Sequence, residues 1–223
     1  MRVFDFIVSL IGIIMLSPIF LFTAVFVKCS SQGPVLYIQK RVGRNGHIFR
    51  LYKFRTMVVN ADRIGTSVTT DNDSRITRVG RILRKTKLDE LPQLWNVLKG
   101  DMSFVGPRPD VPEIVNNYTN AMKRVLEVRP GITSNASLHF RNEEELLSLA
   151  KEPDKAYEEI FVPAKVELAM EHVYRRSFLF DFGVLILTVW ILTGAKVLHI
   201  PTKEHHIVKK IRQSIEKMNH ALV

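Results

Sequence analysis

The sequence predicts a mostly helical α+β protein, in which an apolar helix precedes a small β-hairpin and a series of amphipathic helices. Three observations support this prediction. They are an apolar run over residues 3–27, two short β-favouring runs around a turn signal, and helical spacing of apolar residues after residue 75. Without internal repeats or low-complexity linkers, we expect an apolar helix at 1–30, one domain at 31–200 and a basic tail at 201–223.

The charge of the chain is unevenly distributed. Its 223 residues carry a formal net charge of +10, and between Lys40 and Lys87 there are 13 Lys and Arg but only 3 acidic residues. Such a segment predicts an anionic partner: nucleic acid, phospholipid headgroups or a phosphorylated substrate. The single cysteine, Cys29, excludes an internal disulfide framework and a metal site built from several thiolates.

The apolar run from Val3 to Val27 contains one charge, Asp5, and corresponds to roughly 37 Å of helix, enough to cross a hydrocarbon layer. It exceeds a signal-peptide core and no cleavage site comes after it, so we expect it to be retained. Pro18 removes a backbone hydrogen bond that Ser17 can partly replace, which predicts a kink. The basic residues after position 28 place that part of the chain in the cytoplasm, leaving open a spanning helix or a broken helix that returns to the cytoplasmic face.

A β-hairpin is predicted next. Residues 35–39 and 48–54 favour strands, and Arg-Asn-Gly at 44–46 is a strong hairpin-turn signal. The two-residue period of a strand places Lys53 and Arg55 on one face. From this pattern alone, two solvated surface cations are the favoured interpretation.

A loop and two helices come after the hairpin. The polar segment 60–74 predicts a loop, and residues 75–87 predict a short basic helix with an apolar stripe. Residues 91–99 predict a second helix, with Pro92 in its first turn and Gly100 as its stop.

The sequence Gly-Pro-Arg-Pro at 106–109 predicts a rigid turn that presents Arg108 with little conformational freedom. Such an arginine suits a phosphate, which it can bind through two parallel hydrogen bonds. Further helices are predicted over residues 111–126, 142–151 and 154–175, the last interrupted at Pro163.

Two features are predicted near the C-terminus. The apolar run 178–193 contains Asp181 and has only 16 residues, so an interfacial or core helix is expected. The Lys- and His-rich tail from Thr202 predicts a solvated or headgroup-facing end, in which His205 and His206 are a candidate metal site.

Two adjacent acids, Asp89 and Glu90, stand at the start of the helix predicted at 91–99. Neighbours on a helix point roughly 100° apart, so these carboxylates do not form a facing acid pair. The helix dipole and nearby cations favour ionised forms, which can act as a nucleophile or a hard-metal ligand. An aspartate nucleophile, a second carboxylate for Mg²⁺ and fixed cations suit phosphoryl transfer. The simpler alternative is that Asp89 caps the helix.

Three runs of sequence resemble one known family. QKRVGRNGHIFRLYKFRTM, SRITRVGRILRKTKLDELPQLWNVLKGDMSFVGPRP and RPGIT resemble the bacterial sugar transferase family, monotopic phosphoglycosyl transferases that begin glycan assembly on a lipid carrier. The match extends from the Ser17-Pro18 segment to about Thr133 and is looser to about Thr193. The chain is similar to the small form of the family, because no polytopic membrane domain precedes the apolar run.

The resemblance implies an activity and a site. A sugar 1-phosphate would pass from a UDP-sugar to undecaprenyl phosphate in a ping-pong cycle, giving undecaprenyl diphosphate sugar and UMP. Asp89 would be the nucleophile that becomes a covalent phosphosugar-enzyme, and Glu90 would help to hold Mg²⁺. The Ser17-Pro18 kink would return the helix to the cytoplasmic face, giving a monotopic protein of the bacterial inner membrane.

The resemblance also extends to partners and to other residues. The residues expected to bind substrate phosphates are Lys53, Arg55, Arg75, Arg108 and Arg141. Membrane lipid is an expected partner, nucleic acid is not, and a homodimer is left open. After Thr133 the chain departs from the Gly-Trp-Ala-Gln and Asn-Gly-Arg-Asn motifs of many members, because residues 134–142 keep only Arg-Asn in recognisable order. Sugar and base recognition therefore transfer least well.

Two rival functions remain to be separated by experiment. A membrane-anchored basic adaptor would bind acidic lipid or nucleic acid without catalysis and would give Asp89 no role. A Mg²⁺-dependent phosphohydrolase would share the site but release sugar phosphate to water.

Overall fold

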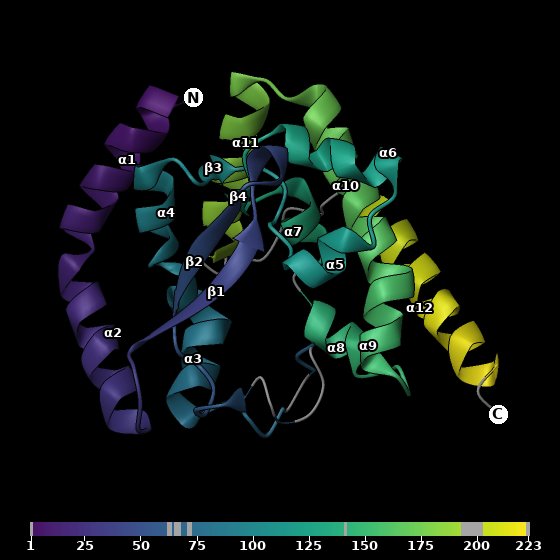
Figure 1. The fold of residues 1–223 in the computed structure, drawn as a ribbon, viewed down its shortest axis with the longest axis horizontal. Coiled ribbons are helices and arrows are strands. Elements are labelled where there is room, and N and C mark those ends of the chain that lie inside the picture. The colour runs from purple at the N-terminus through teal and green to yellow at the C-terminus, as the bar shows by residue number, and fades with distance from the viewer. Residues whose placement is uncertain are drawn as a thin grey trace.

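The computed structural model describes residues 2–61, 64, 68–70, 73–140, 142–192 and 203–221. The α-helices are α1 (Arg2–Met15), α2 (Ser17–Ser30), α3 (Arg78–Thr86), α4 (Gln93–Lys99), α5 (Pro112–Asn116), α6 (Asn120–Lys123), α7 (Asn135–His139), α8 (Glu143–Leu147), α9 (Pro153–Ala156), α10 (Val162–Arg175), α11 (Phe178–Leu192) and α12 (Lys203–Ala221). The strands are β1 (Leu36–Val42), β2 (Ile48–Phe54), β3 (Ser103–Val105) and β4 (Gly131–Thr133). Helices α1 and α2 run along one edge of the molecule and α12 along the opposite edge, with the β1–β2 hairpin between them (Figure 1).

The apolar N-terminal segment forms two helices bent by 62° at the break between α1 and α2. Pro18 has no N–H to offer the carbonyl of Ile14 four residues earlier, and the Ser17 hydroxyl donates to that oxygen instead, at 2.8 Å. The predicted kink is therefore confirmed. Within the described ranges, no single helix has the length and apolar character to cross a membrane, and only the bent pair has both in combination.

Helix α1 is fixed to the rest of the protein through the two charges at its start. The Arg2 guanidinium donates to the carbonyls of Val97 and Leu98 at the end of α4, at 2.6 Å each. Asp5 is 1% exposed and accepts a hydrogen bond from the Ser103 hydroxyl in β3, at 3.0 Å. Hydrogen bonds to charged groups are stronger than neutral ones, so these contacts hold α1 firmly against α4 and β3.

The hairpin forms as predicted, with β1 pairing antiparallel to β2 and Asn45 adopting a left-handed φ of 57° in the turn. The buried Asn96 side chain of α4 extends this hairpin. Its amide donates to the carbonyl of Arg50 at 2.7 Å and its oxygen accepts from the N–H of Tyr52 at 3.2 Å. Helix α4 is thereby held against the edge of β2.

A second sheet, which the sequence pattern did not predict, is the parallel pair β3–β4. The N–H of Gly106 donates to the carbonyl of Thr133 at 3.0 Å, and the N–H of Gly131 donates to that of Pro107 at 2.9 Å. A Cβ at Gly131 would lie 2.1 Å from the nitrogen of Gly106, so only glycine permits this approach. The pairing joins the Gly-Pro-Arg-Pro turn to the Arg-Pro-Gly-Ile-Thr motif.

Several predicted helices are divided differently in the structure. The helix predicted at 111–126 is instead α5, α6 and the 3₁₀ turn η4 (Arg124–Glu127). The interruption expected at Pro163 lies earlier, in the π-helical turn η5 (Tyr157–Phe161). Pro163 is in the first turn of α10, directly after this π-helical turn.

The C-terminal tail is not simply a solvated end. It forms α12, whose Ile211 and Ile215 are 3% and 1% exposed and pack in one cluster with Phe161. The side chains of His205 and His206 lie outside the described residues, so the expected metal site there stays a prediction.

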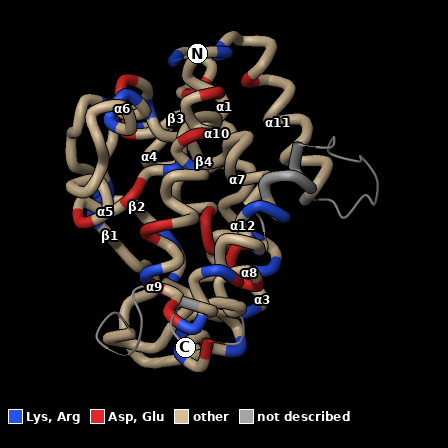
Figure 2. The backbone as a smooth tube through the Cα atoms, turned by 90° about the vertical axis from the view of Figure 1, so that its right-hand side faces the viewer, with Lys and Arg blue, Asp and Glu red and all other residues tan. Residues whose placement is uncertain are grey.

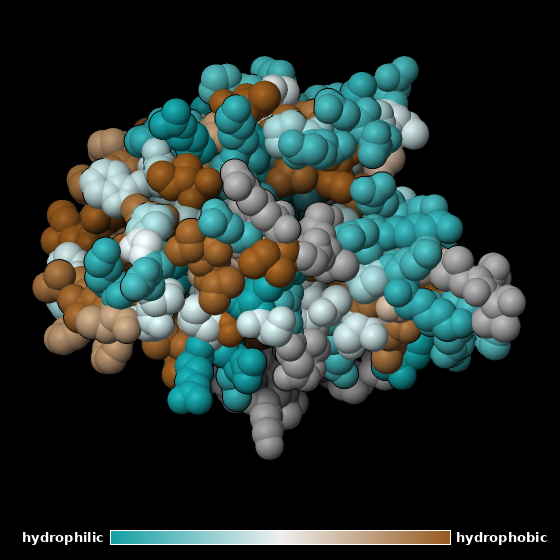
Figure 3. Space-filling model, turned by 60° about the horizontal axis from the view of Figure 1, so that its bottom comes forward, coloured by the Kyte–Doolittle hydropathy of each residue, from teal (hydrophilic) through white to brown (hydrophobic). Residues whose placement is uncertain are grey.

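The surface carries an apolar region formed by α1, α2 and α11. Figure 3 shows hydrophobic atoms gathered at the edge of the molecule where α1 and α2 lie, and in Figure 2 most of the length of α11 is free of charged residues. Phe4 of α1 contacts Phe178 of α11, with ring centroids 6.1 Å apart. The inner side of α11 is buried at Asp181 and Val184, while Phe182 and Trp190 are about half exposed. This arrangement agrees with the expectation of an interfacial helix.

Candidate active site

Asp89 and Glu90 lie at the junction of α3 and α4. Lys87 adopts a left-handed φ of 58° and ends α3, and a 3₁₀ turn, η3 (Leu88–Glu90), carries the two acids immediately before α4. Asp89 is 6% exposed. The predicted position of the pair at the start of a helix is confirmed.

The Glu90 carboxylate joins two cations from different parts of the chain. Its Oε1 accepts from Lys53 Nζ of β2 at 3.1 Å and from an Arg108 guanidinium nitrogen of the Gly-Pro-Arg-Pro turn at 2.8 Å. Burial acts to raise the pKa of Glu90, but Arg108 and Lys53 outweigh it and hold that pKa well below its usual range. Glu90 is therefore an ionised carboxylate held between two cations.

Asp89 has a different environment from its neighbour. Its Oδ1 is buried and has no hydrogen-bond partner among the described residues. Burial raises the pKa of Asp89, and the opposing effect of Lys53 is too weak to reverse the shift. The cations therefore lower the pKa of Glu90 as expected, whereas burial outweighs them at Asp89, which lacks a direct ion pair. An unpaired buried acceptor is costly, and such groups are often retained for function.

Lys53 is also perturbed. Burial lowers the pKa of Lys53 to about 8, although Glu90 acts in the opposite direction. Arg108 adds to the lowering, since it places a second positive charge nearby. The site therefore contains a lysine whose charge changes near physiological pH.

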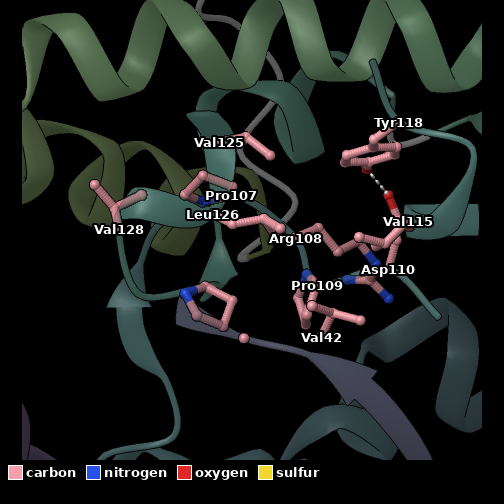
Figure 4. A pocket seen from close by; sticks show the side chains of 12 residues that line it. Val42, Pro107, Arg108, Pro109, Asp110, Val115, Tyr118, Val125, Leu126 and Val128 are labelled. Atoms are coloured by element: carbon pink, nitrogen blue, oxygen red, sulfur yellow. Dashed lines mark hydrogen bonds between the residues drawn. The ribbon is translucent and has the colours of Figure 1, made fainter. Parts of the chain in front are cut away.

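The turn that presents Arg108 is held rigidly from behind. Pro107 and Pro109 are buried, while the Arg108 side chain remains 40% exposed. Behind the turn is a cavity of about 20 Å³, next to which Tyr118 donates to Asp110 at 2.6 Å (Figure 4). A cavity of that size holds roughly one water molecule and no substrate. This cavity is therefore too small to be the substrate site.

The five cations expected to bind phosphate are not all at the acidic pair. Lys53 and Arg108 are, whereas Arg55 donates to the carbonyl of Ser31 at 2.7 Å, just after α2 ends. Arg75 holds the loop before it through Asp73 and the carbonyls of Ala61, Ile64 and Val68. Arg141 lies outside the described residues. A phosphate-binding role for these last three residues stays a prediction.

Arg41 is a residue near the site that was not selected from the sequence. Its guanidinium donates to the carbonyl of Pro109 at 3.0 Å and to the side chain of Gln39 at 2.6 Å. Burial lowers the pKa of Arg41, and the neighbouring charge of Arg108 lowers it further. The two-residue period of β1, which places Gln39 and Arg41 on one face, was the available signal.

The oxygen atoms of the acidic pair suit a hard cation. Asp89 Oδ1 has no described partner, and Glu90 Oε2 has only a 3.5 Å contact with Arg108. Mg²⁺ commonly binds one or two carboxylates together with substrate phosphates and water. In the part of the chain that the structure describes, no cluster of three or more His, Cys, Asp or Glu residues could hold a metal. The pair therefore fits Mg²⁺ only as part of a ligand set that a phosphorylated substrate completes.

A sequence model of the bacterial sugar transferase family matches residues 1–195. The chain belongs to that family. The match includes the helices α1 and α2, the β1–β2 hairpin, the acidic pair and the Gly-Pro-Arg-Pro turn. All the elements that form the site therefore lie within it.

Three relatives illustrate the similarity, and two of them are named as undecaprenyl-phosphate transferases. The chain is 44% identical over 135 residues to UDP-N-acetylgalactosamine-undecaprenyl-phosphate N-acetylgalactosaminephosphotransferase of Aeromonas hydrophila, covering 59% of this chain and 32% of the relative. It is 36% identical over 194 residues to UDP-glucose:undecaprenyl-phosphate glucose-1-phosphate transferase of Escherichia coli, covering 85% and 39%. The uncharacterized sugar transferase EpsL of Bacillus subtilis is 39% identical over 188 residues, covering 84% of each chain. The chain spans less than half the length of the first two relatives.

Proposed function

We propose that this sugar transferase moves a sugar 1-phosphate from a UDP-sugar to undecaprenyl phosphate, as a membrane step of bacterial glycan assembly. The observation that carries the proposal is the buried Asp89 carboxylate beside Glu90, which holds Lys53 and Arg108 together. The activities for which the relatives from Aeromonas hydrophila and Escherichia coli are named support it.

In the proposed cycle, ionised Asp89 attacks the sugar-bearing phosphorus and the phosphorus–oxygen bond to UMP breaks. A phosphate oxygen of undecaprenyl phosphate then attacks the same phosphorus, and the bond to Asp89 breaks to restore the carboxylate. Lys53 and Arg108 offset the negative charge that the anionic nucleophile meets. Mg²⁺ held by Glu90 and the substrate phosphates would supply further neutralisation.

The proposal is tested by a panel of UDP-sugars, each incubated with the purified protein with and without undecaprenyl phosphate. We expect UMP to be released, and the lipid to carry the sugar diphosphate, for at least one UDP-sugar. Free sugar 1-phosphate without lipid product would indicate a phosphohydrolase. Salt-sensitive lipid binding without turnover would indicate an adaptor.

The perturbed pKa values predict a bell-shaped dependence of kcat/KM on pH. Asp89 must be ionised to attack, so the rate should rise as the pH passes its raised pKa. Lys53 must be protonated to neutralise phosphate, so the rate should fall above about pH 8. In Lys53→Arg the descending limb should move to higher pH, because guanidinium stays charged. The same descending limb in both proteins would show that Lys53 is not its cause.

We also propose that α1 and α2 form a re-entrant structure and that α1, α2 and α11 rest in the cytoplasmic face of the inner membrane. The 62° bend and the contact between Phe4 and Phe178 support this topology. The family membership agrees with a membrane-associated enzyme.

Topology can be tested with one introduced cysteine. Val3 is 73% exposed, and the native Cys29 at the other end of the helix pair is also exposed. We expect an impermeant thiol reagent to label Val3→Cys, in a Cys29→Ser background, only from the cytoplasmic side. The wild-type protein, labelled at Cys29, is the control for that side. Labelling of Val3→Cys from the periplasmic side would instead support a helix that spans the membrane.

A further inference from the structure

A second charged cluster is formed by three elements that come after Thr133, where the resemblance to the family motifs becomes looser. It has no part in the cycle above. Lys165 of α10 places its Nζ 2.5 Å from Glu143 Oε1, at the start of α8, and 3.5 Å from the Tyr157 hydroxyl. The Lys165 and Glu143 side chains are 17% and 23% exposed. The cluster is therefore largely withdrawn from water, while part of both side chains remains exposed.

Two aromatic rings complete the cluster. Lys165 Nζ lies 4.6 Å from the ring centroid of Tyr157 and 5.8 Å from that of Phe140. Tyr157 is the first residue of the π-helical turn η5, a rare element that frequently occurs at functional sites. Here the turn joins α9 to α10 and so connects Tyr157 to the helix that carries Lys165.

The cluster lies next to the Arg108 side of the active site. Glu144, the neighbour of Glu143, forms an ion pair with Arg84 in α3, the helix that leads into the acidic pair. The pKa of Arg108 is raised mainly by Glu90, and Glu143 and Tyr157 contribute in the same direction. The negative charge of Glu143 therefore acts on Arg108.

We propose that Glu143, Lys165 and Tyr157 recognise hydroxyl groups of the sugar carried by the nucleoside diphosphate, an inference that rests on the proposed function. A sugar hydroxyl both donates and accepts a hydrogen bond, and the Glu143–Lys165 pair offers an acceptor and a donor side by side.

Other parts of the substrates fit this cluster less well. A phosphate would be repelled by Glu143, and the polyprenyl tail has no polar group for the ion pair. A nucleobase would need a free aromatic face, but the ammonium group of Lys165 lies over the ring of Tyr157. The cluster also comes after Thr133, where the chain departs from the motifs of many family members. The names of two relatives specify different sugars, so a part of the chain outside the common motifs is a suitable place for sugar recognition.

This role predicts a change in sugar selectivity. A site built to hydrogen-bond a hydroxyl discriminates strongly against an epimer that places the hydroxyl elsewhere, because its polar groups are then left unpaired. Removing one of these groups should change the ratio of kcat/KM between 4-epimers by about tenfold or more.

The test compares Tyr157→Phe, Glu143→Gln and the double variant Glu143→Gln/Lys165→Met with the wild-type protein. The double variant removes both charges, so neither is left buried and unpaired. Glu145→Gln is the matched control, because Glu145 is exposed on the same helix as Glu143. Each protein is assayed with UDP-glucose, UDP-galactose, UDP-N-acetylglucosamine and UDP-N-acetylgalactosamine plus undecaprenyl phosphate, and thermal unfolding confirms folding.

We expect altered epimer ratios in the three cluster variants, wild-type ratios in Glu145→Gln, and inhibition by UMP within about twofold of wild type throughout. Unchanged ratios in folded, active Tyr157→Phe and Glu143→Gln would overturn the inference while the proposed function stood. A shift in UMP inhibition with constant sugar ratios would assign the cluster to the nucleotide instead. A wild-type protein that released no UMP from any UDP-sugar would fail the proposed function, and the inference with it.

Discussion

Replacing Asp89 with asparagine is expected to abolish the covalent phosphosugar-enzyme and to lower the transfer rate by at least about a thousandfold, as removal of a nucleophile does in other enzymes. Asparagine keeps the size of the side chain, so substrate can still bind, but its amide cannot attack phosphorus. The measurement is incubation with a UDP-sugar labelled in the β-phosphate, followed by detection of label on the denatured protein. Retention of label by Asp89→Asn would show that Asp89 is not the nucleophile.

Stability provides an independent control for this variant. Because burial raises the pKa of Asp89, the ionised carboxylate opposes folding at neutral pH. Asparagine carries no charge there, so Asp89→Asn should unfold at the same temperature as the wild-type protein or at a higher one. A large loss of stability would mean that Asp89 mainly supports the structure, which is what the helix-capping alternative predicts.

Replacing Glu90 with glutamine is expected to reduce both activity and stability. The change leaves Lys53 and Arg108 without their shared anion, and breaking the largely buried Lys53–Glu90 pair costs on the order of 3 kcal/mol. We expect a loss of at least about a hundredfold in kcat/KM and a weakened response to added Mg²⁺. Activity measured across a Mg²⁺ titration, with chelator as the starting point, gives the result, and an unchanged metal response would remove Glu90 as a ligand.

The stability loss in Glu90→Gln should depend on pH. The folded-state pKa of Glu90 is depressed, so its contribution is present above the usual glutamate pKa and is lost as the pH falls toward the depressed value. The gap in unfolding free energy between wild type and variant should therefore narrow in acid. Glu113→Gln, an exposed acid in α5, is the matched control and should show no gap at any pH.

Local chemistry allowed several features to be predicted from sequence. The break at Ser17 and Pro18 follows from a missing N–H, and the hairpin turn follows from residues that tolerate a left-handed backbone at Asn45. The position of Asp89 and Glu90 before a helix follows from Pro92 and the spacing of apolar residues after it. Each of these features depends on atoms close together in the sequence.

Other features depended on distant contacts. The two-residue period of β2 treats Lys53 and Arg55 alike, but Lys53 binds Glu90 while Arg55 binds the Ser31 carbonyl beyond α2. Helix-end rules predicted pKa shifts in the same direction for both acids, but the shifts are opposite, because only Glu90 has cations close enough to offset its burial.

The sequence by itself therefore determined the break between α1 and α2, the β1–β2 hairpin and the acidic pair before α4. Only the tertiary structure decided which cations reach that pair, how α1 is fastened to α4 through Arg2, and that the parallel pairing of β3 and β4 positions Arg108. The physical reason is that side-chain type and spacing specify what a residue can bind. Which partner a residue meets depends on which segments the fold buries together, and these can be as far apart in the chain as Lys53 and Arg108.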